Sequence, residues 1–177
     1  MDNQRNRIPI YTMLDGVLVS HYTMRELENR DGMVMAFPRT MLSLERVRRD
    51  LCAEAGEEVL VIVKDAMRTG AENARLAERL GWTDEGGLVS RLSKHVPRPE
   101  IVNGKEVIVG GYAVDIIAEA ASDRRRITQS MLGAVCRRHF DFVKDDYADG
   151  HVHADNRGDA WANTKEKPLR LATVRLK

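Results

Sequence analysis

The sequence predicts a single small α+β domain, and two observations support this prediction. The chain has 177 residues and is 43% hydrophobic, so it can bury one core, and a second full domain is not expected. Three stretches place apolar residues at helical spacing, and short runs rich in β-branched residues alternate with them. Helices packed on a sheet would bury both kinds of segment.

The N-terminal part of the chain is predicted to hold few elements. Residues 1–18 are interpreted as a polar lead-in, and the domain is expected to span 19–177, with a short strand near its start in Gly16–Ser20. Thr23 and Glu26 have the spacing of a capping box, in which each side chain bonds the other residue's backbone amide. A short helix is therefore expected to start there.

A helix, a strand and a second helix are expected next. Pro38 opens a stretch in which apolar residues recur at helical spacing, and Gly56 ends it. The residues on this apolar face, which we expect in the core, are Met41, Leu44, Val47 and Leu51. The run 59–63, Val-Leu-Val-Ile-Val, is typical of a buried strand. A second capping box at 69–72 opens a helix through Leu80.

The second half of the chain is predicted to contain a hairpin, two strands and one more helix. Segment 96–109 is interpreted as an inserted β-hairpin, because its Asn103-Gly pair favours a type I′ turn. A strand is expected around Asp115, then a helix whose solvated start is formed by the arginines 124–126. The apolar face of that helix comprises Ile127, Met131, Leu132, Val135 and Phe140. A late edge strand is expected at Leu169–Leu176.

Composition argues against nucleic acid and membrane as partners. A formal net charge of +1, from 28 basic and 27 acidic residues, creates no field that would attract either. Aromatic residues make up only 5% of the chain, too few for a platform on which bases stack. No apolar run approaches the ~20 residues of a membrane span, and no signal-peptide run follows Met1, so we expect synthesis in the cytoplasm without a classical export signal. Nothing in the sequence indicates an oligomeric state.

The cysteines and two of the histidines are interpreted as structural residues. Cys52 and Cys136 lie on apolar stretches of predicted helices without Cys-x-x-Cys spacing, so buried free thiols are favoured over a disulfide. His21 lies near a capping box and His139 near a helix end, where structural roles are more common than metal binding.

The remaining histidines and one aspartate have the chemistry of a zinc site. Zinc binds imidazole nitrogens and carboxylate oxygens, and a catalytic site keeps three protein ligands and one open position. His95, Asp115 and one of the pair His151 and His153 would supply such a set. Asp115 is the only charged residue in an apolar run, which is costly unless it is paired or bound to a cation. The two histidines, two residues apart, would face the same side of a strand.

These motifs resemble those of a known family. Ser93-Lys-His95, Gly111-Tyr-Ala-Val-Asp115 and His151-Val-His153 are similar to the Ser-x-His, Gly-x-Ala-x-Asp and His-x-His motifs of the zinc D-Ala-D-Ala carboxypeptidase family. Upstream, the Met-Arg-Thr at 67–69 with the Glu-Asn-Ala at 72–74 is similar to that family's Arg-Thr and Asn segment. L-alanyl-D-glutamate endolysins and the signalling domain of hedgehog share the fold. The resemblance covers roughly residues 19–155. The chain departs from the pattern at the hairpin insert and at the expected acid, because Asp149 lies one position away from the family's usual offset before the last histidine.

The resemblance implies a fold and a ligand set. The fold is a central, mostly antiparallel sheet with packed helices. The zinc ligands are His95, Asp115 and His153, while His151 lines the site as a donor to the substrate or the transition state; the reverse assignment of the last two histidines is possible. Ser93 would lie near the metal and could hydrogen-bond there.

Arg68 and two aspartates complete the expected site. The resemblance implies that Arg68 holds a substrate carboxylate or the developing oxyanion, and the alternative is a structural ion pair with Asp65 or Glu72. A metal-bound water also needs a carboxylate to take its proton and pass it to the leaving amine. Asp149 is the expected shuttle, with Asp146 as the second choice.

The function implied is zinc-dependent hydrolysis of an amide bond in the stem peptide of peptidoglycan, as a D,D-carboxypeptidase or an L-alanyl-D-glutamate endopeptidase. A phage endolysin, which accumulates in the cytoplasm and acts on the cell wall, would fit a chain without a signal peptide. The alternative is a non-catalytic, zinc-stabilised module that binds cell wall or another protein, for example in a phage particle. The position of the two candidate aspartates relative to the metal would distinguish these functions.

Overall fold

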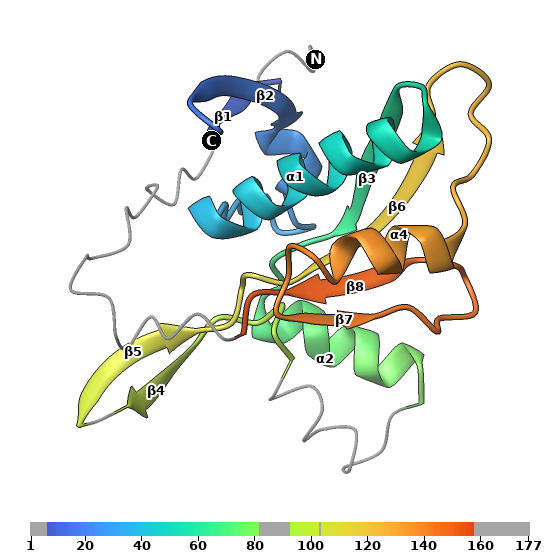
Figure 1. Cartoon of the computed structure of the whole chain (residues 1–177). Helices are drawn as coiled ribbons and strands as arrows, with labels where there is room; N and C mark the ends of the chain where they lie inside the picture. Colours follow the sequence, from blue (N-terminus) through green and yellow to red (C-terminus); the bar gives the residue numbers. More distant parts are fainter. Residues whose placement is uncertain (1–6, 82–92, 103, 158–177) are drawn as a thin grey trace.

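The computed structural model describes residues 7–81, 93–102 and 104–157 (Figure 1). It confirms the α+β class, with a four-stranded sheet in the order β3-β6-β8-β7 in which each neighbouring pair is antiparallel. The strands of this sheet are β3 (Val59–Asp65), β6 (Val114–Ala120), β8 (Val152–Asp155) and β7 (Phe142–Lys144). The central strand β6, which carries the predicted Asp115, lies between β3 and β8.

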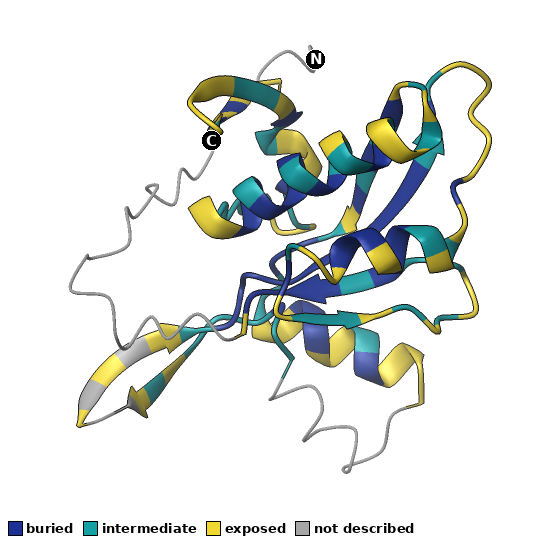
Figure 2. Cartoon of the chain, viewed as in Figure 1, coloured by how far each residue is buried: buried dark blue, intermediate teal, exposed yellow. Residues whose placement is uncertain are grey.

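Two helices pack with this sheet to form the core. α1 (Pro38–Ala55) begins at a proline, whose missing amide hydrogen is not needed in the first turn, and ends at Gly56 in the left-handed conformation. α4 (Gln129–Cys136) contacts α1 and the strand β8. The predicted core residues Met41, Leu44, Val47 and Leu51 are all buried. Figure 2 shows the buried face of α1 and the strands β6 and β8 in dark blue.

The third helix, α2 (Gly70–Arg79), follows β3 after a short connection. Its predicted capping box is present: Thr69 Oγ1 accepts from the backbone N–H of Glu72 at 3.1 Å, and the Glu72 carboxylate accepts from that of Thr69 at 2.7 Å. The Glu72 carboxylate also accepts from Asn29 Nδ2 and from the backbone N–H of Arg30, which ties α2 to the loop before α1. In the view of Figure 1, α2 lies below the β7–β8 pair, apart from α1 and α4.

A hairpin lies in part of the segment that was predicted as a lead-in over 1–18, of which residues 1–6 lie outside the described part of the chain. β1 (Pro9–Leu14) pairs with β2 (Val17–Thr23), and alternate residues of β1, Ile10 and Thr12, are buried. β1 also contacts α1, so this segment belongs to the folded body. The short strand expected near residue 16 is part of β2, and the capping box that follows opens a 3-10 helix, η2 (Met24–Leu27).

The predicted insert is a hairpin that extends away from the body of the molecule (Figure 1). β4 (Arg98–Val102) pairs with β5 (Lys105–Val109), and the register joins Val102 to Lys105 across a two-residue connection. The expected Asn103 of the turn lies outside the described residues. Gly110 closes the base of the hairpin with a φ of +83°, and a Cβ there would lie 2.1 Å from the carbonyl oxygen of Val96. Only glycine fits this position.

Several local features differ from the prediction. The expectation that the arginines 124–126 form the start of a helix is wrong, because α4 begins at Gln129, where Thr128 Oγ1 accepts from the backbone N–H of Met131. The short strand β7 was not predicted. The expected loop at 81–90 lies outside the described residues beyond Gly81, and so does the expected strand at 169–176.

The residues interpreted as structural have structural partners. Cys52 and Cys136 are free thiols, and burial raises the pKa of Cys136 to about 12. His21 Nδ1 lies 2.7 Å from the buried Glu45 carboxylate, and His139 Nε2 lies 2.8 Å from Asp50. None of the described helices combines the length and the apolar character needed to cross a membrane.

Candidate metal centre

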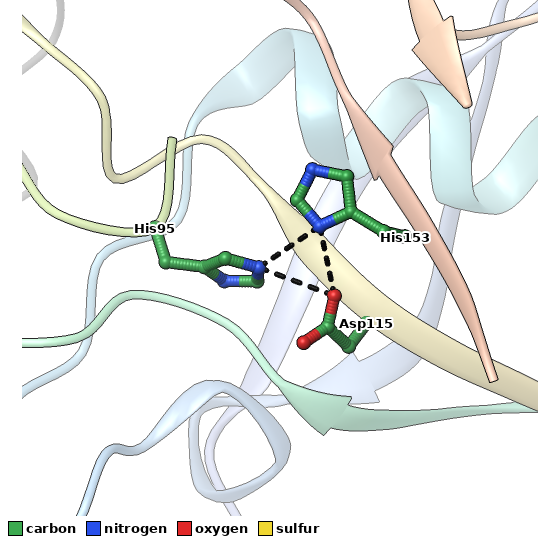
Figure 3. Close-up of side chains that lie close together, drawn as sticks. All are labelled: His95, Asp115 and His153. Carbon is green, nitrogen blue, oxygen red and sulfur yellow. Dashed lines mark hydrogen bonds and ion pairs between the residues drawn. The ribbon is translucent and has the colours of Figure 1, made fainter. Parts of the chain in front are cut away.

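Three of the predicted ligands meet at one point (Figure 3). His95 comes from the segment before β4, Asp115 from β6 and His153 from β8. His95 Nε2 lies 3.1 Å from both Asp115 Oδ1 and His153 Nδ1, and the last two atoms are 2.9 Å apart. The side chains are 3%, 12% and 12% exposed, respectively. These three form the only group of potential metal ligands found among the described residues.

Strand pairing explains why two of the ligands meet. In the antiparallel β6–β8 ladder, Asp115 is directly opposite His153, and directly opposed residues project to the same face of a sheet. His95 reaches the same point because its segment bonds to the residues that follow β3 and to the turn before β6. The backbone N–H of Arg68 donates to the His95 carbonyl at 2.9 Å, and that of Gly111 donates to the Lys94 carbonyl at 2.7 Å.

The outer nitrogen of each imidazole already has a partner. His95 Nδ1 lies 2.5 Å from the carbonyl oxygen of Ala66, which can only accept, so this nitrogen donates. His153 Nε2 lies 3.1 Å from the carboxylate of the buried Asp155. In the neutral tautomers that these partners favour, both inner nitrogens present lone pairs, and Asp115 Oδ1 presents a third. Three converging acceptors repel one another unless a cation or a proton lies between them.

Arg68 fixes the orientation of Asp115. Its Nη2 donates to Asp115 Oδ2 at 3.0 Å, and its Nε donates to Asp65 Oδ2 at 2.7 Å. Of the two roles expected for Arg68, the structure therefore shows the ion pair with Asp65, and it adds Asp115 as a second partner. Because Arg68 occupies Oδ2, the other oxygen of Asp115 is left to face the two imidazoles.

The environment keeps both carboxylates of the site ionised. Burial alone would raise the pKa of Asp115, but when a proton rather than a cation lies between the three inner atoms, attraction to His95 and hydrogen bonds from His153 and His95 hold that pKa well below its ordinary value. Burial likewise opposes the ionisation of Asp155, yet the hydrogen bonds from Arg157 and His153 lower its pKa to about 2. For His153, burial lowers the pKa, but the hydrogen bonds to Asp115 and Asp155 outweigh it and the pKa is raised. The site thus favours positive charge at its centre.

The size and the chemistry of the donor set fit a transition metal ion. In a tetrahedral zinc centre with bonds of about 2.0–2.2 Å, neighbouring ligand atoms are about 3.3–3.6 Å apart. The separations of 2.9–3.1 Å in this triangle differ from that by only a few tenths of an ångström. Two imidazoles and one carboxylate suit zinc, and three protein ligands would leave one position open. A carboxylate on the outer nitrogen of a ligating histidine, as Asp155 provides here, is common in such sites.

His151 lies beside the triad and directs one nitrogen toward it. Its Nε2 is 3.9 Å from Asp115 Oδ1, and its Nδ1 is 2.5 Å from Asp149 Oδ1. The ring of Tyr147 stacks on the imidazole, with 3.9 Å between centroids. Gln129 Nε2 donates to the backbone carbonyls of Tyr147 and His151, so the first turn of α4 anchors this loop. His151 is therefore fixed from several sides.

The other predicted residues have partners outside the triad. Asp149 is 72% exposed and contacts His151, whose hydrogen bond lowers its pKa. Asp146 is 75% exposed and lies 3.6 Å from Lys144 Nζ. Ser93 Oγ accepts from the backbone N–H of His95 at 3.4 Å, so it supports the backbone of a ligand. Of the two candidate shuttles, only Asp149 has a direct contact to a residue at the site.

Four contributors to the site were not predicted: Asp155, Tyr147, Gln129 and the carbonyl of Ala66. Asp155 had a signal in the sequence, because it continues the two-residue alternation of His151 and His153 along a strand. Gln129 and the carbonyl of Ala66 depend on contacts between separate elements, for which no local pattern exists, and the stacking of Tyr147 on His151 depends on how one loop folds.

Comparisons with known proteins do not assign a family. No family model matches the sequence, and searches of curated proteins and of solved structures give no match either. Evidence about function therefore comes from the geometry of the site and from the order of the motifs in the sequence.

Proposed function

We propose that the protein is a zinc-dependent peptidase that hydrolyses an amide bond in the stem peptide of peptidoglycan. The metal centre is supported by three acceptor atoms, one each from His95, Asp115 and His153, that converge on one point. The other nitrogen of each imidazole and the other oxygen of the carboxylate already have partners. The order of the motifs, which resembles that of zinc carboxypeptidases and endopeptidases of the cell wall, supports the choice of substrate. The exposed fractions of His151 and Arg68, 17% and 14%, are small but leave both side chains in reach of a ligand.

The chemistry that a zinc ion supplies when bound to this set is Lewis acidity, which polarises an amide carbonyl and lowers the pKa of water. The proton of the attacking water goes to His151, whose Nε2 faces the site. Asp149 holds Nδ1 of the same ring and stabilises the positive charge that the ring then carries. The Nε2 proton is finally donated to the leaving amine. In this scheme Asp149 acts through His151 and does not contact the water.

Arg68 has two roles in this proposal. Two of its nitrogens hold Asp65 and Asp115, and this keeps the carboxylate ligand in place. Its third nitrogen, Nη1, makes no hydrogen bond within the described part of the chain and can donate to a carbonyl oxygen or a carboxylate of the peptide. Charge that develops on the carbonyl oxygen during attack would be stabilised there.

A non-catalytic, zinc-stabilised binding module is the second candidate. The observation that favours it is the placement of the two candidate shuttles: Asp149 reaches the site only through His151, and Asp146 pairs with Lys144. Such a module would bind cell wall or another protein, for example within a phage particle.

Mass spectrometry of peptidoglycan fragments distinguishes the two candidates. Purified fragments are incubated with the zinc-loaded protein, with the protein plus a chelator, and with the chelated protein after zinc is restored. A peptidase produces new fragments that disappear with the chelator and return with zinc, and their masses identify the bond that is cut. If a protein shown to carry one zinc ion per chain produces no fragment, the binding module is correct instead.

A further inference from the structure

A pocket of about 320 Å³ lies next to the metal centre. Its walls are the loop that follows η2 and the end of β3, and its floor is one face of α2, where Glu72, Arg75, Leu76 and Arg79 follow one another at spacings of three, one and three residues. The volume is in the range of sites that bind small molecules or short peptide segments. Two lining residues also contact the metal centre: Arg68 donates to Asp115, and the carbonyl of Ala66 accepts from His95.

The acidic side chains around the pocket are already engaged. Glu26 accepts from the backbone N–H and the hydroxyl of Thr23. Glu72 accepts from three N–H groups in the capping box and the neighbouring loop. Asp65 is paired with Arg68, and Glu28 also has a partner. These four carboxylates are therefore held in place by the fold.

Three of the basic side chains are not engaged in this way. Arg68 is bound to Asp65 and Asp115, and Arg75 lies 3.4 Å from a carboxylate oxygen of Asp31. Arg30, Lys64 and Arg79 form no ion pair with a carboxylate in the parts of the chain that the structure describes. They come from the two walls and the floor of the pocket: the loop after η2, the strand β3 and the helix α2. Among the described residues, five basic and four acidic side chains line the pocket, so the basic side chains are in excess, and a bound anion would supply a partner to the three that form no ion pair.

We propose that this pocket binds a carboxylate group of an acidic peptide, with Arg30, Lys64 and Arg79 as the groups that bind it. Arg68 connects the pocket to the metal centre, because it lines the pocket and donates to the metal-facing Asp115. A peptide with its carboxylate in the pocket would thus have a neighbouring amide near the metal. This last step rests on the proposed function, whereas binding of the carboxylate does not require hydrolysis.

Calorimetric titration with two matched peptides tests the proposal. One synthetic peptide carries glutamate residues, and the other carries glutamine at the same positions. Both are titrated into the zinc-loaded full-length chain, into the double variant Lys64→Ala/Arg79→Ala, and into Arg124→Ala as a control. Arg124 is an exposed arginine that pairs with Glu119 and does not line the pocket.

The glutamate peptide is expected to bind about tenfold more weakly to the double variant than to the wild type, since removing a hydrogen bond to a charged group weakens binding several-fold. The control variant should bind it as the wild type does, and the glutamine peptide should bind the wild type as weakly as the glutamate peptide binds the double variant. Inorganic phosphate is a second probe, and it should compete with the glutamate peptide.

Equal affinity of the wild type and the double variant for the glutamate peptide would overturn the proposal. Binding of phosphate that the glutamate peptide does not displace would overturn the assignment to a peptide. Charge-dependent binding without any zinc-dependent hydrolysis of peptidoglycan would support the pocket and contradict the proposed peptidase. The two proposals can therefore fail independently.

Discussion

Both nitrogens of the His153 imidazole have partners within the protein, without a bound metal. Nδ1 faces Asp115 and His95, and Nε2 faces Asp155. Asp155 is itself fixed, because its side chain is fully buried and accepts from both Nε and Nη2 of Arg157. A ligand whose ring orientation is set in this way loses little freedom on binding a metal.

Removing the charge of Asp155 should therefore weaken metal binding. Asn in place of Asp155 has nearly the same size, but it accepts a weaker hydrogen bond from His153 and leaves the ring less basic. We expect the affinity for zinc to fall about 10–100-fold, measured by competition with a chelator of known affinity. Asp146→Asn, at an exposed position outside the triad, is the matched control. Equal zinc affinity of both variants would show that Asp155 does not act on the ligand.

Asp149 gives a separate test, because it contacts His151 and none of the three ligands. The variant Asp149→Asn should keep one zinc ion per chain and lose about 10²–10⁴-fold in the rate of stem-peptide hydrolysis. Metal analysis and the rate are measured on the same sample. Full activity of Asp149→Asn would contradict the role of Asp149 in holding His151, and full activity of both Asp149→Asn and Asp146→Asn would exclude any part of either aspartate in proton transfer.

Asp50, remote from the metal centre, makes stability depend on pH. Burial opposes its ionisation, but the hydrogen bonds from His139 and Arg49 outweigh burial and lower its pKa. A carboxyl whose pKa is lower in the folded than in the unfolded state stabilises the fold above its unfolded pKa, and this stability is lost as the pH falls through the folded value. The free energy of unfolding in urea should fall between pH 6 and about pH 3. This fall should be smaller in Asp50→Asn than in the wild type, by up to about 1 kcal/mol. The exposed Asp123→Asn should behave as the wild type does.

At the scale of elements, the sequence predicted the helices and strands whose residues repeat with a regular period. It missed the strands that form only because a neighbouring element pairs with them or covers them. α1, α2, β3 and the hairpin β4–β5 have helical or strand patterns with capping or turn signals at their ends, and all are present. β7 has only three residues and forms because β8 offers it a partner. β1 begins at a proline and forms because β2 pairs with it and α1 covers one of its faces.

The same distinction holds for the site. The convergence of His95, Asp115 and His153 could be predicted because each lies in a short motif that resembles one of the zinc peptidase motifs, in the same order. The carbonyl of Ala66 could not, since it meets His95 only after β3 and the segment before β4 come together, 29 residues apart in the chain. Partners of this kind become visible only once the strand order is known.

A substitution at the base of the β4–β5 hairpin tests how this element positions the candidate ligand His95. In Gly110→Ala the new Cβ would lie 2.1 Å from the carbonyl oxygen of Val96, the residue after His95, in a backbone conformation that alanine rarely adopts. We expect a loss of about 2–4 kcal/mol in the free energy of unfolding, together with weaker zinc binding.

The matched control is Gly104→Ala, at the tip of the same hairpin. Its φ of +74° carries the same conformational cost, but nothing lies within 4 Å of the added Cβ. A loss of only about 1–2 kcal/mol is expected from the left-handed backbone alone, with unchanged zinc affinity. If the two substitutions lower the free energy of unfolding in urea equally, the close approach to Val96 adds no cost of its own.

At the scale of the whole molecule, one core supports a hairpin that forms its own two-stranded sheet. The pairing of Arg98 with Val109 places the two ends of the hairpin side by side, so a Gly-Gly link in place of 98–109 can close the gap. This variant should keep its zinc and melt within a few degrees of the wild type, because the exposed hairpin contributes little to the core. We expect its product profile on peptidoglycan fragments to change, since the hairpin starts three residues after His95. An unchanged profile would mean that the hairpin does not shape specificity.

The three candidate ligands are far apart along the chain, and this has a consequence for unfolding. Asp115 is 20 residues from His95 and 38 residues from His153. An ion bound to all three would act as a cross-link that closes two loops, and such a link disfavours the unfolded chain by restricting its freedom. β8 joins β6 through only three residue pairs, so the ion would also hold β8, and with it the edge strand β7, to the rest of the sheet. Loss of the metal would then expose that end of the protein to proteases well before the rest of the fold gives way.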